Sequence, residues 1–166
     1  IRWDSDLGGG ALMDLGCYCV NVIRTMADQE PVEVQAFARW APGGVDEQLA
    51  GTLRFDSGAL AQFDCAFNME GRQAFEITGD NTTLKLRAPF TPGEGETTIY
   101  EQRGRKEMVA HTIKGANQYQ LMVEHFADCV LNDHPLRYSA AEAAANMRAM
   151  DAVYLSARSG GRPVQL

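Results

Sequence analysis

Apolar residues in the first part of the chain recur at the spacing of a helix. Three consecutive glycines, Gly8-Gly9-Gly10, lead into this segment, which continues to about Met26. At about 100° per residue the apolar positions form one stripe, which predicts the core face of a helix. We expect that face to consist of Leu12, Leu15, Cys19, Val22 and Met26.

The middle of the chain alternates apolar and polar residues, which indicates β-strands. Pro31 separates this region from the first helix. Short turn signals such as Asp56-Ser57-Gly58 connect successive strands, so we expect a mostly antiparallel sheet. The expected strands lie near residues 32–40, 48–56, 59–67, 75–77, 84–86, 97–102 and 107–113.

Two helices are predicted after the strands. Asn117 with Gln120, and Ser139 with Glu142, have the spacing of helix N-caps. The apolar stripe of the first of these helices is Tyr119, Met122, Val123, Phe126 and Val130. The stripe of the second is Ala143, Met147, Met150, Tyr154 and Ala157.

Together these elements predict an α+β fold in a single domain, residues 1–166, with one large open sheet and helices packed on one face. The other sheet face then needs solvent or a partner. Phe37, Phe63 and Phe67 indicate more apolar surface than three helices cover. We therefore expect a homodimer formed through the open face of the sheet.

Composition and charge narrow the classes of function. With 45% hydrophobic and 22% charged residues, and no apolar run near the about 20 residues of a membrane span, the chain has the composition of a soluble globular domain. Its net charge of −7 argues against nucleic acid and membrane surfaces as partners. Arg103-Gly104-Arg105-Lys106 is a short basic cluster, which we expect in a solvent-exposed turn.

The four cysteines, Cys17, Cys19, Cys65 and Cys129, lack the spacing of a zinc site. We interpret them as small buried hydrophobic residues with free thiols, rather than as metal ligands or disulfide partners. Free thiols favour a reducing compartment. We therefore expect a cytoplasmic protein in which these residues bind no metal.

Polar side chains on the first helix form the strongest candidate site. Asp14 and Tyr18 are one turn apart and share a stripe with Asn21 and Thr25, about a quarter-turn or more from the core face. The preceding glycines let a backbone or a ligand approach the helix start, whose partial positive charge suits an anion or a polarised oxygen. Spacing alone favours a structural interpretation, with Asp14 as a first-turn acid and Tyr18 as a half-buried amphipathic residue.

Longer sequence matches change that balance. The first helix begins with Gly8-Gly9-Gly10-Ala11-Leu12-Met13-Asp14-Leu15-Gly16-Cys17-Tyr18, and further motifs follow in order along the chain. These are Pro31-Val32-Glu33-Val34, Gly44-Val45-Asp46-Glu47, Gly51-Thr52-Leu53-Arg54-Phe55-Asp56-Ser57-Gly58-Ala59 and Ala152-Val153-Tyr154-Leu155-Ser156-Ala157-Arg158-Ser159-Gly160. Together they resemble the C-terminal domain of the glucose–fructose oxidoreductase/inositol dehydrogenase (Gfo/Idh/MocA) family.

The resemblance implies an enzyme of two domains. A Rossmann domain comes first and binds NAD or NADP, and a substrate and dimer domain like the C-terminal domain of dihydrodipicolinate reductase follows. It implies that Tyr18 carries the proton transfer and that Asp14 orients the substrate hydroxyl. Many members carry histidine in place of Tyr18, and tyrosine is similar to the glucose–fructose oxidoreductase and dihydrodiol dehydrogenase branches. A phenol has an ordinary pKa of about 10, and a lysine from the Rossmann domain would stabilise its phenolate.

Other polar residues are weaker candidates. Arg39, on the first strand, is a candidate for binding the substrate, and an exposed strand arginine is the alternative interpretation. Asn21 and Arg24 fit helix-surface roles. We interpret the scattered histidines as surface or helix-end residues: His111, His125 and His134.

The sequence contains no Gly-x-Gly-x-x-Gly after a strand and no ribose-binding acid about 20 residues further on. We therefore expect no Rossmann domain in this chain, with NAD or NADP bound in the full-length enzyme and none bound to this chain by itself. The sequence predicts the substrate-binding and dimerisation half of an oxidoreductase that acts on a CH–OH group of a sugar, polyol or diol. The alternative is a non-enzymatic binding or assembly module that retained the sheet domain.

Overall fold

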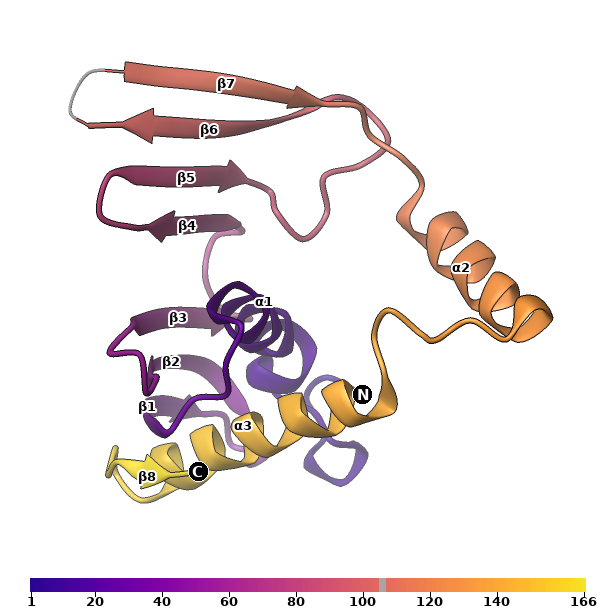
Figure 1. Cartoon of the computed structure of the whole chain (residues 1–166). Coiled ribbons are helices and arrows are strands. Elements are labelled where there is room, and N and C mark those ends of the chain that lie inside the picture. The colour runs from indigo at the N-terminus through magenta and orange to yellow at the C-terminus, as the bar shows by residue number, and fades with distance from the viewer. Residues whose placement is uncertain (105–106) are drawn as a thin grey trace. The chain divides into compact units, whose positions relative to one another are not determined.

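The computed structural model describes residues 1–104 and 107–166, and its elements follow the expected order (Figure 1). The basic turn expected at 103–106 falls partly on residues 105 and 106, outside the described residues. The helices are η1 (Ser5–Leu7), η2 (Leu12–Gly16), α1 (Cys17–Ala27), α2 (Gln118–Asn132) and α3 (Ala140–Arg158). The strands are β1 (Glu33–Trp40), β2 (Asp46–Arg54), β3 (Leu60–Ala66), β4 (Ala74–Thr78), β5 (Thr82–Arg87), β6 (Thr97–Arg103), β7 (Glu107–Ile113) and β8 (Val164–Gln165).

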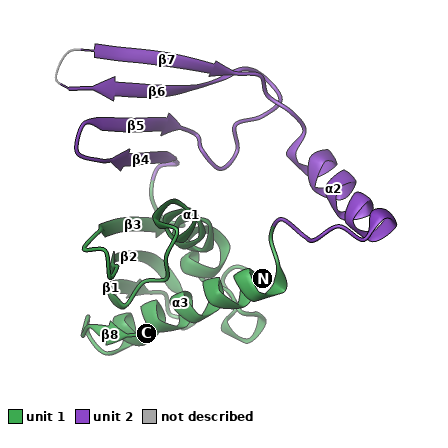
Figure 2. Cartoon of the chain, in the orientation of Figure 1, with its two compact units in different colours: residues 1–69, 138–166 green, residues 70–137 purple. Residues whose placement is uncertain are grey.

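The chain forms two compact units, residues 1–69 with 138–166 and residues 70–137 (Figure 2). The first contains an antiparallel sheet in the order β3-β2-β1-β8, and the second one in the order β4-β5-β6-β7. The α+β class with antiparallel strands is thus confirmed, but hydrogen bonding divides the expected single sheet into two. Residues 67–73, which contain Gly71 and no β-branched residue, form a connection rather than a tight turn between β3 and β4. A single domain over residues 1–166 stays a prediction.

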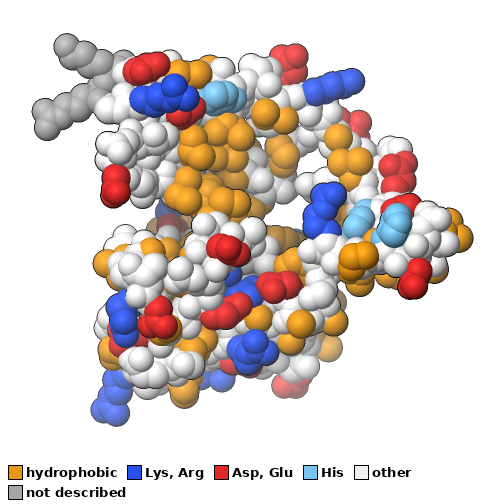
Figure 3. Space-filling model, viewed as in Figure 1, with side chains coloured by type: hydrophobic (Ala, Val, Ile, Leu, Met, Phe, Trp, Pro, Cys, Tyr) orange, Lys and Arg blue, Asp and Glu red, His pale blue; other side chains and the backbone are white. Residues whose placement is uncertain are grey.

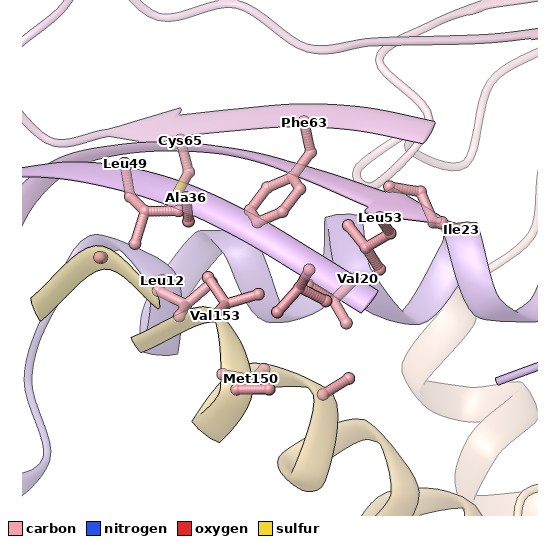
Figure 4. Packing of buried hydrophobic residues seen from close by; sticks show 14 of the residues in the cluster. Leu12, Val20, Ile23, Ala36, Leu49, Leu53, Phe63, Cys65, Met150 and Val153 are labelled. Atoms are coloured by element: carbon pink, nitrogen blue, oxygen red, sulfur yellow. The ribbon is translucent and has the colours of Figure 1, made fainter. Parts of the chain in front are cut away.

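The core of the first unit lies between its sheet and three helical segments (Figure 4). Alternate residues of the strands, among them Leu53 and Phe63, face η2, α1 and α3 on one side of the sheet. The Phe63 ring packs closely over Gly51 and Gly16, where a Cβ would meet it at 2.8 and 3.6 Å. The helices contribute Leu12, Val20, Ile23, Met150 and Val153.

The buried face of the first helix differs from the expected one. Leu12 is fully buried, but Leu15 and Met26 are 39% and 50% exposed, and Cys19 and Val22 are only partly buried. The positions that continue the core face are Gly16, Val20 and Ile23. The expected stripe was wrong because η2 is a π-helical turn, in which an extra residue rotates all later positions relative to a regular α-helix.

The two late helices begin at the expected N-caps. Asn117 accepts a hydrogen bond from the Gln120 amide at 3.0 Å, and Ser139 accepts one from the Glu142 amide at 3.2 Å. In α3, Met150 and Ala157 are buried, whereas Ala143 and Met147 of the expected stripe are exposed. Small residues occur on every side of α3, so its period is weakly marked. The α3 face is completed by Ala145, Asn146, Ala149, Val153 and Ser156.

Helix α2 leaves its apolar stripe exposed. The exposed fractions of its five stripe residues run from 57% for Phe126 to 69% for Tyr119. Cys129 is buried instead, with its sulfur 3.6 Å from Nε2 of His125 and 3.5 Å from the carbonyl oxygen of Pro135. His125 Nε2 also accepts the backbone N–H of Arg137. These contacts fasten the end of α2 to the segment that follows it.

The outward face of the first sheet is less apolar than expected. Phe63 is only 8% exposed in the core, and the Phe67 ring packs against Trp3 with their centroids 5.1 Å apart. Only Phe37 of the three phenylalanines points outward, and it is 60% exposed. Its neighbours across the sheet are Ala50 and Asp64. The expectation that all three rings exceed what the helices cover was therefore wrong, since β3 turns Phe63 towards η2.

The second sheet has one apolar face. Its register aligns Phe75, Leu86 and Ile99 across β4, β5 and β6, and none of the three is fully buried. Figure 3 shows apolar side chains gathered over β4 and β5. The same face holds a polar contact on its last two strands, where Glu101 of β6 lies 2.7 Å from His111 of β7. No helix in the described ranges 1–104 and 107–166 has the length and apolar character needed to cross a membrane.

Arg24 is a buried structural residue rather than the expected helix-surface one. Its side chain is 4% exposed and donates to Glu30, with Nε 2.8 Å from Oε2. It also donates to Glu142 at 3.2 Å and to the Asn146 side chain at 3.4 Å. Asn146 donates in turn to the carbonyl oxygen of Cys17. The guanidinium therefore ties the end of α1 to the following loop and to α3.

This ion pair predicts a loss of stability in acid. The hydrogen bond from Arg24 lowers the pKa of Glu30, so its contribution is present above the ordinary value of about 4.3 and is lost as pH falls through the lowered pKa. Because the Glu30 side chain is 54% exposed, we expect less than about 1 kcal/mol. Urea unfolding of the wild type and of Glu30→Gln between pH 7 and pH 3 measures it: their difference in unfolding free energy should shrink below pH 4–5. A constant difference would contradict the prediction.

Candidate active site

The helix start is held by close backbone contacts that glycine alone permits. The amide of Gly10 donates to the carbonyl oxygen of Arg2 at 2.9 Å. A Cβ on Gly9 would lie 2.5 Å from that same oxygen, and Gly10 has a φ of +126°. The approach that the glycines allow is thus used by the chain's own lead-in segment.

The first turn of the helix is a π-helical turn. The N–H of Cys17 bonds to the carbonyl of Leu12, five residues earlier, while the amide of Asp14 bonds to Gly10 at 3.0 Å. Such turns are frequent at functional sites. Asp14 lies inside this turn, and Tyr18 is the second residue of α1.

The two expected catalytic residues both reach the surface. Tyr18 is 57% exposed, and the Asp14 side chain is 28% exposed. Asn21 and Thr25 share the stripe of these two residues. Asn21 is partly buried, and Thr25 is exposed. The solvent-facing stripe therefore lies where the sequence places it, even though the opposite, core-facing stripe does not.

Two partners of this stripe could not be found from the sequence. Arg2 forms an ion pair with Asp14, with Nε 2.9 Å from Oδ2. Tyr138, which precedes the N-cap of α3, accepts a hydrogen bond from the Asn21 side chain at 2.9 Å. A separation of 117 residues between Asn21 and Tyr138 leaves no local signal for this contact.

Arg39 is not brought to the helix start. It belongs to the outward set of alternate residues on β1, and its side chain is 72% exposed. Its Nε lies 2.6 Å from Oε1 of Glu47. This placement matches the alternative interpretation, an exposed strand arginine.

The thiols beside the site are poor nucleophiles. Burial raises the pKa of Cys17, and it raises the pKa of Cys19 to about 11 and that of Cys65 further still. A thiol with a raised pKa stays protonated near neutral pH, and the thiolate is the reactive form. Cys65 belongs to the hydrophobic core, and Cys17 and Cys19 are partly buried against it, so these three cysteines are packing residues, as the sequence indicates.

A buried carboxylate that bonds to the helix start is not predicted by the sequence. Asp46 is 1% exposed, and its oxygens accept hydrogen bonds from the Leu12 amide at 2.7 Å and from the Tyr154 hydroxyl at 2.8 Å. Burial is the main cause that raises its pKa, and it also raises the pKa of Tyr154, whose hydrogen bond to Asp46 adds to the shift. The sequence contains this residue within one of the family motifs, without any indication of its partners.

Solved structures with the same fold are oxidoreductases of about twice this length. Aldose-aldose oxidoreductase from Caulobacter crescentus, complexed with glycerol, superposes with a TM-score of 0.85 at 24% identity over 99% of this chain and 50% of its own. KijD10, a 3-ketoreductase from Actinomadura kijaniata in complex with NADP and TDP-benzene, gives 0.84 at 24% identity over 94% of this chain and 48% of its own. At this identity the likeness establishes the fold.

Sequence comparison gives the family. Residues 1–85 match the GFO/IDH/MocA C-terminal domain. D-xylose 1-dehydrogenase (NADP(+)) 2 of Haloferax volcanii is 31% identical over 96% of this chain and 49% of its own length. Trans-1,2-dihydrobenzene-1,2-diol dehydrogenase of Danio rerio is 36% identical over 49% of this chain and 25% of its own. The chain belongs to the Gfo/Idh/MocA family, and it spans about half the length, or less, of these curated relatives.

Proposed function

We propose that this chain is the substrate-binding and dimerisation half of an NAD(P)-dependent oxidoreductase that acts on a CH–OH group of a sugar, polyol or diol. The observation that carries the proposal is the placement of Asp14 and Tyr18. Both reach solvent from a helix start whose other face is fixed in the core. The relatives named for xylose and dihydrodiol oxidation support this substrate class.

The chemistry of alcohol oxidation assigns the roles. A hydride must leave carbon and a proton must leave oxygen, and the acceptor for the hydride would be supplied by NAD or NADP bound in the full-length enzyme. Tyr18 exchanges the proton: its phenolate accepts it from the substrate hydroxyl during oxidation, and its phenol returns it during reduction. Because the ordinary pKa of tyrosine is about 10, the phenolate needs a nearby cation. The family resemblance points to a lysine of the cofactor domain.

Asp14 positions the substrate in this scheme. Its carboxylate accepts a hydrogen bond from a hydroxyl next to the reacting one, whose own proton goes to Tyr18, and this fixes the alcohol next to Tyr18. Its Oδ2 also contacts the Arg2 guanidinium at 2.9 Å. The absence of a dinucleotide fingerprint from the sequence supports a role on the substrate side alone. A cytoplasmic location is part of the same proposal.

The direct test is turnover by the full-length protein. Reduced nicotinamide is followed by its absorbance with NAD and NADP against a panel of aldoses, polyols and vicinal diols. We expect turnover of at least one of them. If calorimetry shows a bound cofactor and no member of the panel is oxidised or formed, the enzymatic proposal fails and the non-enzymatic binding module is favoured.

We propose that the expected homodimer forms through the second sheet. Its apolar face is the better candidate for a self-complementary interface, since the outward face of the first sheet is mainly polar. Leu84→Asp places a charge on that face, whereas Thr83→Asp places one on the opposite face of the same strand. We expect light scattering to show a dimer for the wild type and Thr83→Asp and a monomer for Leu84→Asp. Identical masses for all three would contradict this interface.

A further inference from the structure

A carboxylate buried beneath the candidate site has no role in the proposed chemistry. Asp46 is the first residue of β2 and lies opposite Trp40 in the strand register. Aspartate is rarely buried completely unless its charge is compensated. At 1% exposure, Asp46 therefore calls for a specific compensation.

Both oxygens of Asp46 are used, and one of them serves the helix start. Oδ2 accepts the Leu12 amide at 2.7 Å, and Oδ1 accepts the Tyr154 hydroxyl at 2.8 Å. A helix start carries unpaired N–H groups that a capping side chain normally satisfies. Ala11, at the N-cap of η2, provides no such side chain. Asp46 supplies that acceptor from a strand 34 residues away.

Gly10 leaves the space that this contact needs. A Cβ at Gly10 would lie 2.1 Å from Oδ1 of Asp46 and 2.8 Å from the Tyr154 hydroxyl. The last glycine of the run is therefore explained by Asp46 rather than by an approaching ligand.

Tyr154 is itself held from its other side. Its ring stacks with Trp40 at a centroid distance of 6.4 Å, and the Arg158 guanidinium lies 5.2 Å from its centroid. Burial raises the pKa of Asp46, while the two hydrogen bonds and the positive charge of Arg158 oppose that rise. The carboxylate is thus fixed between the helix start and a packed aromatic group.

We propose that Asp46 is a positioning residue, which acts through the Leu12 amide to hold the π-helical turn in the geometry that presents Asp14 and Tyr18 to the substrate. Asp14 follows Leu12 by two residues inside this turn, and Tyr18 is the second residue of α1, which begins directly after the turn. A shift of the turn therefore moves both groups together. This inference rests on the proposed function for its kinetic consequence but not for its structural one.

The kinetic test uses the full-length enzyme and a double-mutant cycle. We expect Asp46→Ala to lower kcat/KM by about 10–100-fold, because misplacement of reacting groups costs rates of that order. In a Tyr18→Phe background the same change should have a smaller effect, because the misplaced proton-transfer group is then already removed and only the displacement of Asp14 remains. Asp46→Asn keeps one oxygen for the Leu12 amide and an amide group for Tyr154, so it should restore most of the activity. An equal fold-loss in both backgrounds would overturn the proposal.

Hydrogen exchange gives a readout that does not depend on turnover. In Asp46→Ala we expect faster exchange of the amides of residues 11–18, with little change elsewhere in the first unit. Ser156→Ala is the matched control: Ser156 is fully buried and bonds to the Ala36 amide at 2.9 Å, so its loss weakens the contact of α3 with β1 instead. Uniformly faster exchange in Asp46→Ala would overturn the positioning role, even if the wild type turned over no substrate.

A milder variant covers the case in which Asp46→Ala does not fold. Tyr154→Phe removes only the hydrogen bond to Oδ1 and keeps the ring on Trp40. We expect smaller changes of the same kind. Amide exchange should become faster over residues 11–18, and kcat should fall in the wild-type background but less in the Tyr18→Phe background. If the Tyr154→Phe variant showed the same amide exchange and kinetics as the wild type, the Asp46–Tyr154 pair would not be what supports the turn.

Discussion

Replacing Tyr18 with phenylalanine lowers kcat of the full-length enzyme by a factor of roughly 10²–10⁴, the usual contribution of a general acid–base group. The substitution removes one hydroxyl from a side chain that is 57% exposed, so the fold and the ring remain. The loss should appear mainly in kcat, because proton transfer belongs to the transition state rather than to substrate binding. Steady-state kinetics on a substrate that the wild type turns over measure it.

Two further variants make this result specific. Tyr119→Phe removes a phenolic hydroxyl from an exposed residue of α2, and it should leave kcat unchanged. Asp14→Asn should raise KM and lower kcat. A neutral amide orients the substrate hydroxyl less strongly than a carboxylate, and it leaves Arg2 without its ionic partner. Circular dichroism checks that each variant is folded. A folded Tyr18→Phe enzyme with near-normal kcat would mean that the proton travels through another group.

Leu12→Ala lowers the unfolding free energy by about 2–5 kcal/mol, the range for leucines removed from a close-packed core. Leu12 is fully buried, and its Cδ1 lies so close to Gly16 that a Cβ there would meet it at 2.8 Å. The turn cannot easily close the space left by Leu12, because its contact with β3 is equally tight. The Cys65 sulfur would lie 2.9 Å from a Cβ on Gly16. Denaturant unfolding of this chain measures the change.

Leu15→Ala is the matched control for that prediction. Leu15 lies three residues away in the same turn and is 39% exposed, so we expect a loss of less than about 1 kcal/mol. A regular α-helix with the stripe expected from the sequence would place both leucines in the core, and the two losses would then be similar. Equal losses would therefore contradict the π-helical turn rather than only its energetics.

Local chemistry explains which elements could be predicted. The N-caps Asn117 and Ser139 and the turn at Asp56-Ser57-Gly58 each depend on residues within a few positions, and the structure confirms all three. A π-helical turn depends instead on packing, here of Gly16 against Phe63 and Cys65 of a strand some 50 residues later. Its register shift could not be read from apolar spacing, which assumes one period throughout.

The candidate site divides in the same way. Asp14 and Tyr18 could be proposed because they lie on one helix and within one motif. Arg2, Tyr138 and Asp46 contact the same helix through tertiary folding, so sequence periodicity carries no information about them. The separation into two sheets could not be predicted because β3 and β4 follow one another in the chain, and nothing local in residues 67–73 shows that the two strands do not pair.

In the proposed function, the helix start formed by η2 and α1 faces the substrate. A crystal structure of the full-length protein with its nicotinamide cofactor and a sugar or diol that it turns over tests this most directly. We expect the reacting oxygen to lie within about 2.6–3.2 Å of the Tyr18 hydroxyl, with the Asp14 carboxylate bonded to a neighbouring hydroxyl of the substrate. A substrate bound at the cofactor while Tyr18 and Asp14 face only solvent would contradict it.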